Sequence, residues 1–178
     1  MKIVLLTGSP HRHGASNMLA DRFAEGAQEA GHEVYRFDCA SASVHPCIGC
    51  DSCRKEDSKG CVFRDDMTEL NPKLLEADAI VFASPIYYFG LSAQIKTVID
   101  RFYANNTALM GGKKCALLLA AGDPYEHNME GARLTFELMA HYLQWDIVDM
   151  VFGDGCYTPQ DMAATGYPNH AYQLGLRF

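Results

Sequence analysis

The chain has 178 residues, of which 48% are hydrophobic and 21% are charged, and its 15 basic and 22 acidic residues give a formal net charge of −7. This length is typical of a single domain, here residues 1–178, whose core needs no disulfide or structural metal. The negative balance provides no basic stripe for nucleic acid or for an anionic membrane surface. No apolar run approaches the ~20 residues of a membrane span, and Gly8 interrupts the short apolar start that a signal peptide would need. We therefore expect a cytoplasmic protein without nucleic-acid or membrane partners.

The start of the chain predicts a strand, a loop, a helix and a second strand. Residues 2–6 form a near-continuous apolar run, which is too short for a buried helix and is typical of a central strand. Apolar residues then recur at helical spacing, with Ser16 or Asn17 available as the N-cap and Gly31 as the stop signal. Residues 33–37 alternate in polarity, which indicates the second strand.

The rest of the chain repeats this alternation. Three further strands are expected over 79–83, 115–121 and 147–152. Before the first of them we expect a helix over 70–76 with Pro72 in its first turn, and after it a helix whose apolar face consists of Ile95, Val98, Ile99 and Phe102. A long helix with its apolar face on Leu134, Leu138, Tyr142 and Trp145 precedes the strand over 147–152, and a last helix over 160–176, interrupted near 166–168, follows it. Five strands alternating with helices predict a doubly wound α/β fold, a parallel sheet covered on both faces. Ligands of such sheets bind outside the carboxyl ends of the strands, so the loops after the first, third and fourth strands are candidate sites.

The loop after the first strand, residues 8–17, has features of a phosphate cradle. Its glycines allow a ligand to approach the backbone, and the hydroxyls of Ser9 and Ser16 can bind an anion together with the amides of the following helix. The loop matches neither the dinucleotide fingerprint nor the P-loop pattern. An ordinary turn with a capping serine is the alternative.

The loop after the third strand, residues 84–90, contains three consecutive aromatic residues, Tyr87, Tyr88 and Phe89. Aromatic side chains and exposed amides at this position suit a flat heteroaromatic ring. The same residues could instead close a subunit interface, and both roles are compatible.

Together these residues resemble the flavodoxin-like NAD(P)H-dependent FMN reductase family. The pattern G-S-P-x-x-x-G-x-S, the loop S-P-I-Y-Y-F-G and the helix from Lys96 to Arg101 match in order, and the resemblance runs from Lys2 to about Phe152. It implies a flavodoxin-like fold, bound FMN, and a homodimer or dimer of dimers with the flavin near the subunit boundary.

The resemblance also assigns cofactor-binding residues. Around the phosphate it places Ser9, His11, Ser16, Asn17 and Met18, and along the isoalloxazine ring it places Pro85, Ile86, Tyr87, Tyr88, Phe89 and Gly90. A weaker match puts Gly122 at the flavin edge. The family commonly has arginine where this chain has His11, so a permanently charged phosphate partner is missing there and Arg12 is its possible substitute. No catalytic acid or base is assigned, because the cofactor performs the chemistry.

Residues 39–66 show no clear period and form an unusually long connection, which indicates a functional insertion. Four cysteines in it, Cys47, Cys50, Cys53 and Cys61, follow the spacing C-x2-C-x2-C-x7-C. Repeated three-residue spacing brings thiolates together in the way that iron–sulfur cubanes use. The stretch is similar to that of iron–sulfur flavoproteins, whose motif binds a [4Fe–4S] cluster beside the flavin. Zinc, or reduced thiols without any metal, are the alternatives. The other three cysteines are predicted to be small core residues: Cys39, Cys115 and Cys156.

The sequence thus supports three hypotheses about function. The first is an enzyme whose FMN takes a hydride from NADH or NADPH and passes electrons to a small acceptor such as a quinone or a free flavin. The second is an electron-transfer carrier, either a flavodoxin-type shuttle or an iron–sulfur flavoprotein supplied with electrons by ferredoxin. The third is a flavin-free binding protein on the same fold, since a fold alone does not determine function.

Overall fold

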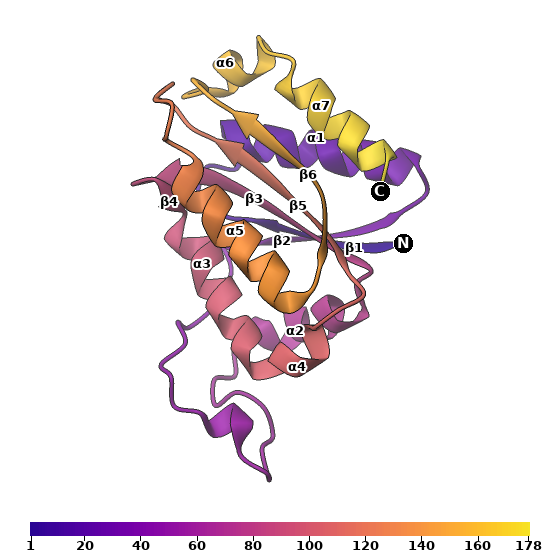
Figure 1. Cartoon of the computed structure of the whole chain (residues 1–178), viewed down its shortest axis with the longest axis vertical. Helices are drawn as coiled ribbons and strands as arrows, with labels where there is room; N and C mark the ends of the chain where they lie inside the picture. Colours follow the sequence, from indigo (N-terminus) through magenta and orange to yellow (C-terminus); the bar gives the residue numbers. More distant parts are fainter.

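The computed structural model describes residues 1–178, and its centre is a parallel sheet with strand order β2-β1-β3-β5-β6 (Figure 1). The strands are β1 (Lys2–Thr7), β2 (Glu33–Asp38), β3 (Ala79–Tyr87), β5 (Lys114–Ala120) and β6 (Asp146–Gly153). This is the flavodoxin-like order, and all five predicted strands are confirmed. A short sixth strand, β4 (Gly90–Leu91), was not predicted; it pairs antiparallel with the end of β3.

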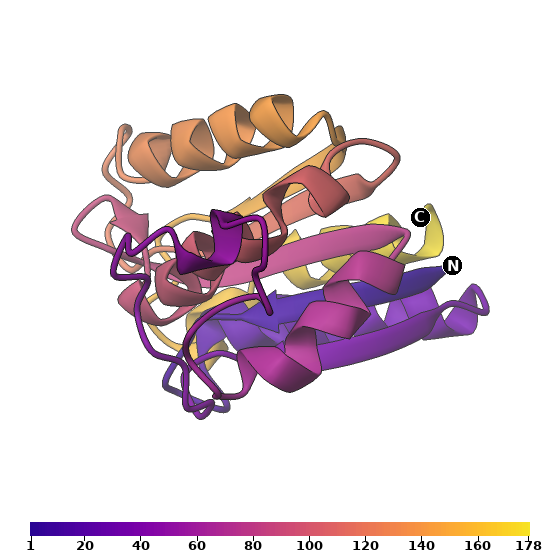
Figure 2. The same cartoon turned by 90° about the horizontal axis from the view of Figure 1, so that it is seen from below.

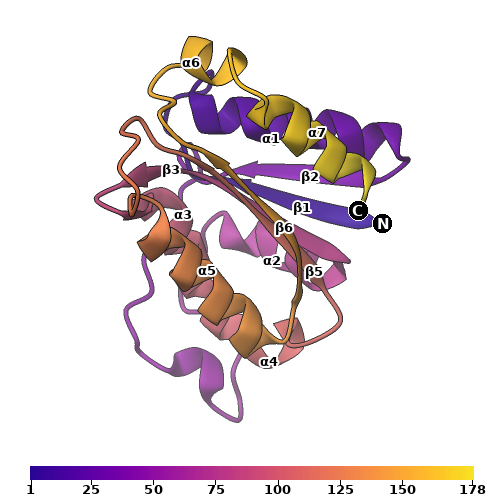
Figure 3. The ribbon, with the colours of Figure 1, turned by 45° about the horizontal axis from the view of Figure 1, so that its top comes forward.

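Helices cover both faces of the sheet (Figure 3). One layer contains α1 (Ala15–Glu29), α6 (Pro159–Ala163) and α7 (Tyr167–Leu176). The other contains α2 (Met67–Glu76), α3 (Ala93–Asp100), α4 (Asn106–Leu109) and α5 (Glu130–Leu143), with a 3₁₀ turn over Arg101–Asn105 between α3 and α4. Because side chains alternate along a strand, Ile3 and Leu5 of β1 enter the core on the α1 side of the sheet, whereas Val4 and Leu6 enter the core on the side covered by α2, α3 and α5. No helix combines the length and the apolar character that crossing a membrane requires.

The last helix rests directly on the first. A Cβ atom at Gly175 of α7 would lie 2.2 Å from the carbonyl oxygen of Phe23, and one at Gly26 of α1 would lie 2.1 Å from that of Tyr172. Only glycine permits this backbone approach. The expected interruption of the final helix is also confirmed, because α6 ends at Ala163 and α7 begins at Tyr167.

Two predicted helix starts were wrong. Helix α1 has Gly14 as its N-cap, so Ser16 and Asn17 lie inside its first turn. Helix α2 begins at Met67, whose amide donates to the carboxylate of Asp65 at 3.2 Å, and Pro72 therefore lies in the second turn.

The predicted apolar face of α5 was wrong as well. Leu134, Leu138 and Tyr142 are 52%, 60% and 58% exposed, and Trp145 lies beyond the end of the helix. The buried face consists instead of Ala132, Phe136, Ala140 and Leu143. Small alanines let the helix approach the sheet closely, which turns the larger apolar stripe toward solvent.

The cysteine-bearing segment between β2 and α2 extends beyond α3 and α4 at one end of the molecule (Figure 1), and it lies in front when the molecule is viewed from that end (Figure 2). It contains one 3₁₀ turn, Ser52–Arg54, and no strand.

Candidate functional site

A cavity of about 1080 Å³ opens at the carboxyl ends of four parallel strands. Its walls come from residues 9–16 after β1, 85–87 at the end of β3, 120–128 at the end of β5 and beyond it, and 156–159 after β6. This is the edge at which doubly wound sheets bind ligands, and the volume suits a large small-molecule cofactor.

The loop between β1 and α1 is held in a compact turn by its own hydrogen bonds. The Oγ of Ser9 accepts from the amide of His11 at 3.1 Å, and the Nδ2 of Asn17 donates to the carbonyl of His11 at 2.9 Å. A Cβ atom at Gly14 would lie 3.1 Å from that same carbonyl oxygen and 3.3 Å from the Oγ of Ser9. The turn therefore leaves little space for any residue other than glycine at position 14.

This turn presents the N-terminus of α1 to the cavity without a cap. Gly14 has no side chain to satisfy the first amides of the helix, and the first turn contains no acidic residue. Such an end carries partial positive charge and free N–H donors, which is the arrangement that binds phosphate. The phosphate group of FMN fits this end of the cavity.

The aromatic loop is a strained two-residue hairpin. Ile86 pairs with Leu91 and Tyr87 with Gly90, which leaves Tyr88 and Phe89 at the tip with φ of 46° and 63°. Positive φ is unfavourable for bulky residues, and such strain persists mainly at functional sites. The side chain of Tyr88 is fully exposed.

The hairpin is anchored at both ends. At its base, the Oγ of Ser92 donates to the carbonyl of Gly8 at 2.8 Å, and the amide of Ser92 donates to the Oγ of Ser84 at 3.0 Å. At its tip, the ring of Phe89 meets that of Tyr125 edge to face, with 6.2 Å between centroids. The hairpin is thereby bonded to the loop after β1 and packed against the loop after β5.

The loop after β6 completes the cavity wall. Thr158 and Asp161 form a reciprocal capping box at the start of α6, and these hydrogen bonds lower the pKa of the Asp161 carboxyl. Cys156 is buried, and burial raises the pKa of its thiol. Tyr157 remains 84% exposed on the cavity side of this loop.

The sequence-predicted cofactor residues divide into two groups. The cavity is lined by Ser9, His11, Ser16, Pro85, Ile86, Tyr87 and Gly122, whereas Asn17, Met18, Tyr88, Phe89 and Gly90 do not line it. Of the second group, Asn17 stabilises the turn through its hydrogen bond to the carbonyl of His11, and Met18 packs against the core under α1. The other three form the hairpin tip and its closing pair.

Several lining residues were missed by the sequence reasoning. His13 belongs to a loop already identified, whereas Cys156, Tyr157 and Thr158 come from a loop that was not considered. Arg12, the possible substitute for a charged phosphate partner, does line the cavity. The available signal was that the fifth parallel strand ends at the same edge of the sheet as the other four.

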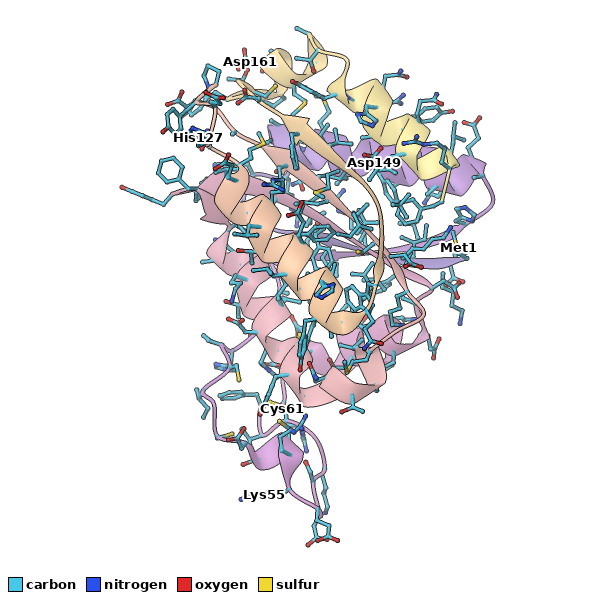
Figure 4. All side chains as sticks on the ribbon, viewed as in Figure 1. Met1, Lys55, Cys61, His127, Asp149 and Asp161 are labelled. Carbon is cyan, nitrogen blue, oxygen red and sulfur yellow. The ribbon has the colours of Figure 1, made fainter.

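The four cysteines of the insertion line a second pocket, which lies beside the 3₁₀ turn after α3 and also contains Phe63, Arg101 and Tyr103. The two pockets share no lining residue. Figure 4 shows Cys61 at the opposite end of the molecule from His127 and Asp161, which are neighbours in sequence of residues that line the large cavity. Burial raises the pKa of the Cys53 thiol, and the nearby thiols Cys61, Cys50 and Cys47 raise it further. No three His, Cys, Asp or Glu side chains, however, stand close enough to hold a single metal ion.

A buried ion pair fixes this pocket to the fold. The side chains of Arg101 and Asp65 are only 2% and 3% exposed, and Nη1 of Arg101 donates to Oδ2 of Asp65 at 2.6 Å. Burial alone would raise the pKa of Asp65, but its hydrogen bonds to Arg101 and the amide of His45 outweigh that effect and lower it. One donor of this arginine, Nε, is buried without a partner. A pocket lined by four thiols and by an arginine with an unpartnered donor has the chemistry to fit an anionic, sulfur-ligated group.

The comparisons with known proteins agree with this fold. A family model described as NADPH-dependent FMN reductase matches residues 1–154, and the chain belongs to that family. An iron-sulfur flavoprotein of Archaeoglobus fulgidus is 36% identical over 124 residues, which cover 68% of this chain and 56% of that relative. The putative NAD(P)H-dependent FMN-containing oxidoreductase YwqN of Bacillus subtilis is 24% identical over 165 residues, covering 87% and 86% of the two chains.

Among solved structures, a flavone reductase superposes with a TM-score of 0.75 at 21% identity, covering 99% of this chain and 61% of that one. At this identity the likeness establishes the fold. The chain spans little more than half the length of the iron-sulfur flavoprotein that it matches. The part of the cavity wall formed by residues 156–159 lies beyond the residues matched by the family model.

Proposed function

We propose that the protein binds FMN in the cavity at the sheet edge and acts as an oxidoreductase, taking electrons from NAD(P)H and passing them to a small acceptor such as a quinone or a flavin. The observation that carries this proposal is the uncapped N-terminus of α1, set in a cavity large enough for the flavin. Membership of the FMN reductase family supports it.

In this proposal FMN supplies the hydride and electron chemistry, and the protein binds and orients it. The amides that open α1 and the hydroxyls of Ser9 and Ser16 hold the phosphate, with His11 and Arg12 beside them. Pro85, Ile86 and Tyr87 lie along the isoalloxazine ring, and Gly122 lies at its edge. Asn17 positions the phosphate loop through the carbonyl of His11.

We assign the hairpin tip, Tyr88 to Gly90, to the outer rim of the flavin site. Its exposed aromatic side chains suit contact with a second copy of the chain in a homodimer or a dimer of dimers, where the same residues would also exclude water from the ring.

The test is an anaerobic absorption spectrum of the purified protein after reconstitution with FMN. We expect a bound-flavin spectrum that bleaches on addition of NADH or NADPH and recovers when a quinone is added. A protein that retains no FMN would overturn the proposal, and it would favour the flavin-free binding protein instead.

A second candidate function is electron transport through a [4Fe–4S] cluster held by Cys47, Cys50, Cys53 and Cys61. The unpartnered Nε of Arg101 in the pocket of these four thiols favours it, as does the name of the iron-sulfur flavoprotein relative. A cluster suits these thiols better than zinc, because each thiolate binds a different iron and the four ligands can stay farther apart.

Iron and sulfide analysis of anaerobically purified protein tests this candidate. We expect about four of each per chain, since a cubane holds four irons and four sulfides. A flavin that stays oxidised with NAD(P)H but is reduced by ferredoxin would identify the carrier. Protein that takes up neither iron nor sulfide, yet oxidises NAD(P)H, would exclude the cluster and leave the reductase.

A further inference from the structure

We propose that Arg101 is a positioning residue for the cysteine pocket, whose Nε–H donates a hydrogen bond to sulfur at the Cys61 corner and so favours the reduced state of the bound cluster. This inference rests on the proposed cluster. It assigns to the chain a residue that tunes the redox potential and is not itself a ligand.

The first observation is the hydrogen bonding of the guanidinium group. Nη1 donates to Oδ2 of Asp65 at 2.6 Å and to the carbonyl of His45 at 2.7 Å, and Nη2 donates to Oδ1 of Asp65 at 3.2 Å. These three bonds fix the plane of the group, and Nε alone has no partner. A buried unpaired donor is costly, so a side chain this well ordered is expected to bind an acceptor there.

The second observation is where that donor lies. Arg101 lines the same pocket as the four cysteines. Burial by itself lowers the pKa of Arg101, but the hydrogen bond and charge of Asp65 outweigh this effect, and Cys61 adds to the increase. Because Arg101 and Cys61 line the same pocket, we assign the Cys61 sulfur as the acceptor for the free Nε donor.

The third observation is the apolar cover on the arginine. The Cζ of Arg101 lies 5.2 Å from the ring centroid of Phe63, and Phe63 stacks on the ring of His45 at 4.9 Å between centroids. This cover keeps water away from the guanidinium, and hydrogen bonds are stronger where the local dielectric is low.

The consequence follows from charge. One-electron reduction makes a thiolate-ligated cluster more negative, and hydrogen bonds to its sulfurs stabilise the more negative state. A fixed, buried donor therefore raises the reduction potential. Asp65 opposes this effect with its own negative charge while holding the donor in place.

Potentiometric titration of cluster-loaded protein, followed by visible absorption and electron paramagnetic resonance, tests the inference. Arg101→Lys keeps the charge but loses the planar fork and the Nε donor. We expect its equilibrium constant for one-electron reduction to fall about tenfold, a shift of about 59 mV to more negative potential. Arg54→Lys is the matched control, because Arg54 is an exposed arginine in the same insertion, and its potential is expected to stay unchanged.

The Asp65→Asn variant is expected to shift the reduction potential in the opposite direction. Asparagine keeps a side-chain oxygen that can accept from Arg101 but removes the negative charge, so the potential is expected to rise, opposite to the fall expected for Arg101→Lys. If the Arg101→Lys variant does not load a cluster, the change in reduction potential of the Asp65→Asn variant tests the inference instead. An unchanged or lower potential in Asp65→Asn, or a wild-type potential in fully loaded Arg101→Lys, would overturn the inference.

Measurements on the wild-type protein distinguish failure of the proposed cluster from failure of the proposed role of Arg101. Wild-type protein that cannot be loaded with iron and sulfide overturns the cluster and the role of Arg101 together. A loaded wild type whose potential is insensitive to Arg101 and Asp65 overturns only the role of Arg101.

Discussion

The ring of Tyr157 lies directly against Gly122, so that a Cβ atom at position 122 would stand 2.6 Å from the Cδ2 of the tyrosine. This contact joins the loop after β6 to the loop after β5, at the wall of the large cavity. The position of Tyr157 therefore depends on the absence of a side chain at residue 122.

Gly122→Ala is expected to displace Tyr157 and weaken FMN binding. Overpacking of this kind costs about 1–3 kcal/mol, so an affinity loss of about tenfold is expected. Titration of FMN with fluorescence detection measures it. The double variant Gly122→Ala/Tyr157→Ala should regain part of the affinity, because the clash is then removed. Equal losses in the single and double variants would contradict this reading of the contact.

Gly14→Asp is expected to weaken binding of FMN but not of riboflavin, which has no phosphate. A carboxylate at the N-cap of α1 would compete with the phosphate for the same amides and repel it. Gly14→Asn is the matched control, since it occupies the same space without charge. We expect FMN affinity to be about tenfold lower in the Asp variant than in the Asn variant, a difference of about 1.4 kcal/mol. If both flavins lost affinity equally, the phosphate would bind elsewhere.

Gly175→Ala is expected to destabilise the whole fold by about 1–3 kcal/mol. The new methyl group would lie 2.2 Å from the carbonyl oxygen of Phe23, so α7 would have to move away from α1. Urea denaturation followed by circular dichroism measures the change in the free energy of unfolding. Gly166→Ala is the control, because a Cβ atom there meets nothing within 4 Å, and its stability should remain near that of the wild type.

Replacing the hairpin tip by Tyr88→Asn/Phe89→Gly is expected to raise stability. Both positions have positive φ, and Asn-Gly is the sequence that such two-residue turns prefer. Relief of strain is expected to add about 1–3 kcal/mol to the free energy of unfolding. The aromatic rim would be lost, so steady-state NAD(P)H oxidation should fall as stability rises. A variant that is no more stable than the wild type would show that the turn is not strained.

Asp149 is expected to make the free energy of unfolding depend on pH in the acid range. Its Oδ2 accepts from Nε2 of His170 at 3.0 Å and from Nη2 of Arg177 at 2.8 Å. Burial on its own raises the pKa of Asp149, but its hydrogen bonds, led by that from His170, outweigh burial and lower it below its ordinary value. A lowered pKa in the folded state means that the stabilisation is present above the unfolded value of about 3.9 and is lost as the pH falls through the folded value.

Asp149→Asn should therefore reduce the free energy of unfolding at pH 7 by about 0.5–1 kcal/mol, the usual range for partly exposed ion pairs. Chemical denaturation at pH 7 and at about pH 2.5, below the unfolded pKa, gives the comparison. The difference between variant and wild type should be smaller at the lower pH, because protonation of Asp149 removes part of its charge stabilisation there. A difference that persists undiminished in acid would mean that packing, rather than charge, accounts for the loss.

The strands were predictable because the runs at Lys2–Thr7 and Lys114–Ala120 are buried on both faces and therefore almost continuously apolar. The buried face of α5 was not predictable, because Leu134 and Leu138 have the spacing of a buried apolar stripe. Only tertiary packing shows that the side facing the sheet carries alanines instead. The sequence identified three of the four walls of the cavity, those after β1, β3 and β5. The wall at Tyr157 could not be inferred from local pattern, since its position depends on a contact with Gly122, which is distant in the sequence.

The hydrogen bonds of Ser92 have a further consequence for the apoprotein. By donating to the carbonyl of Gly8, while its own amide donates to Ser84, Ser92 holds the two loops together before any ligand arrives. A site prepared in this way loses little conformational freedom on binding, and its cofactor can associate without waiting for a loop to order. The backbone amides of Gly8 and Ser92 should accordingly exchange with deuterium slowly in the apoprotein, at rates close to those of the sheet itself.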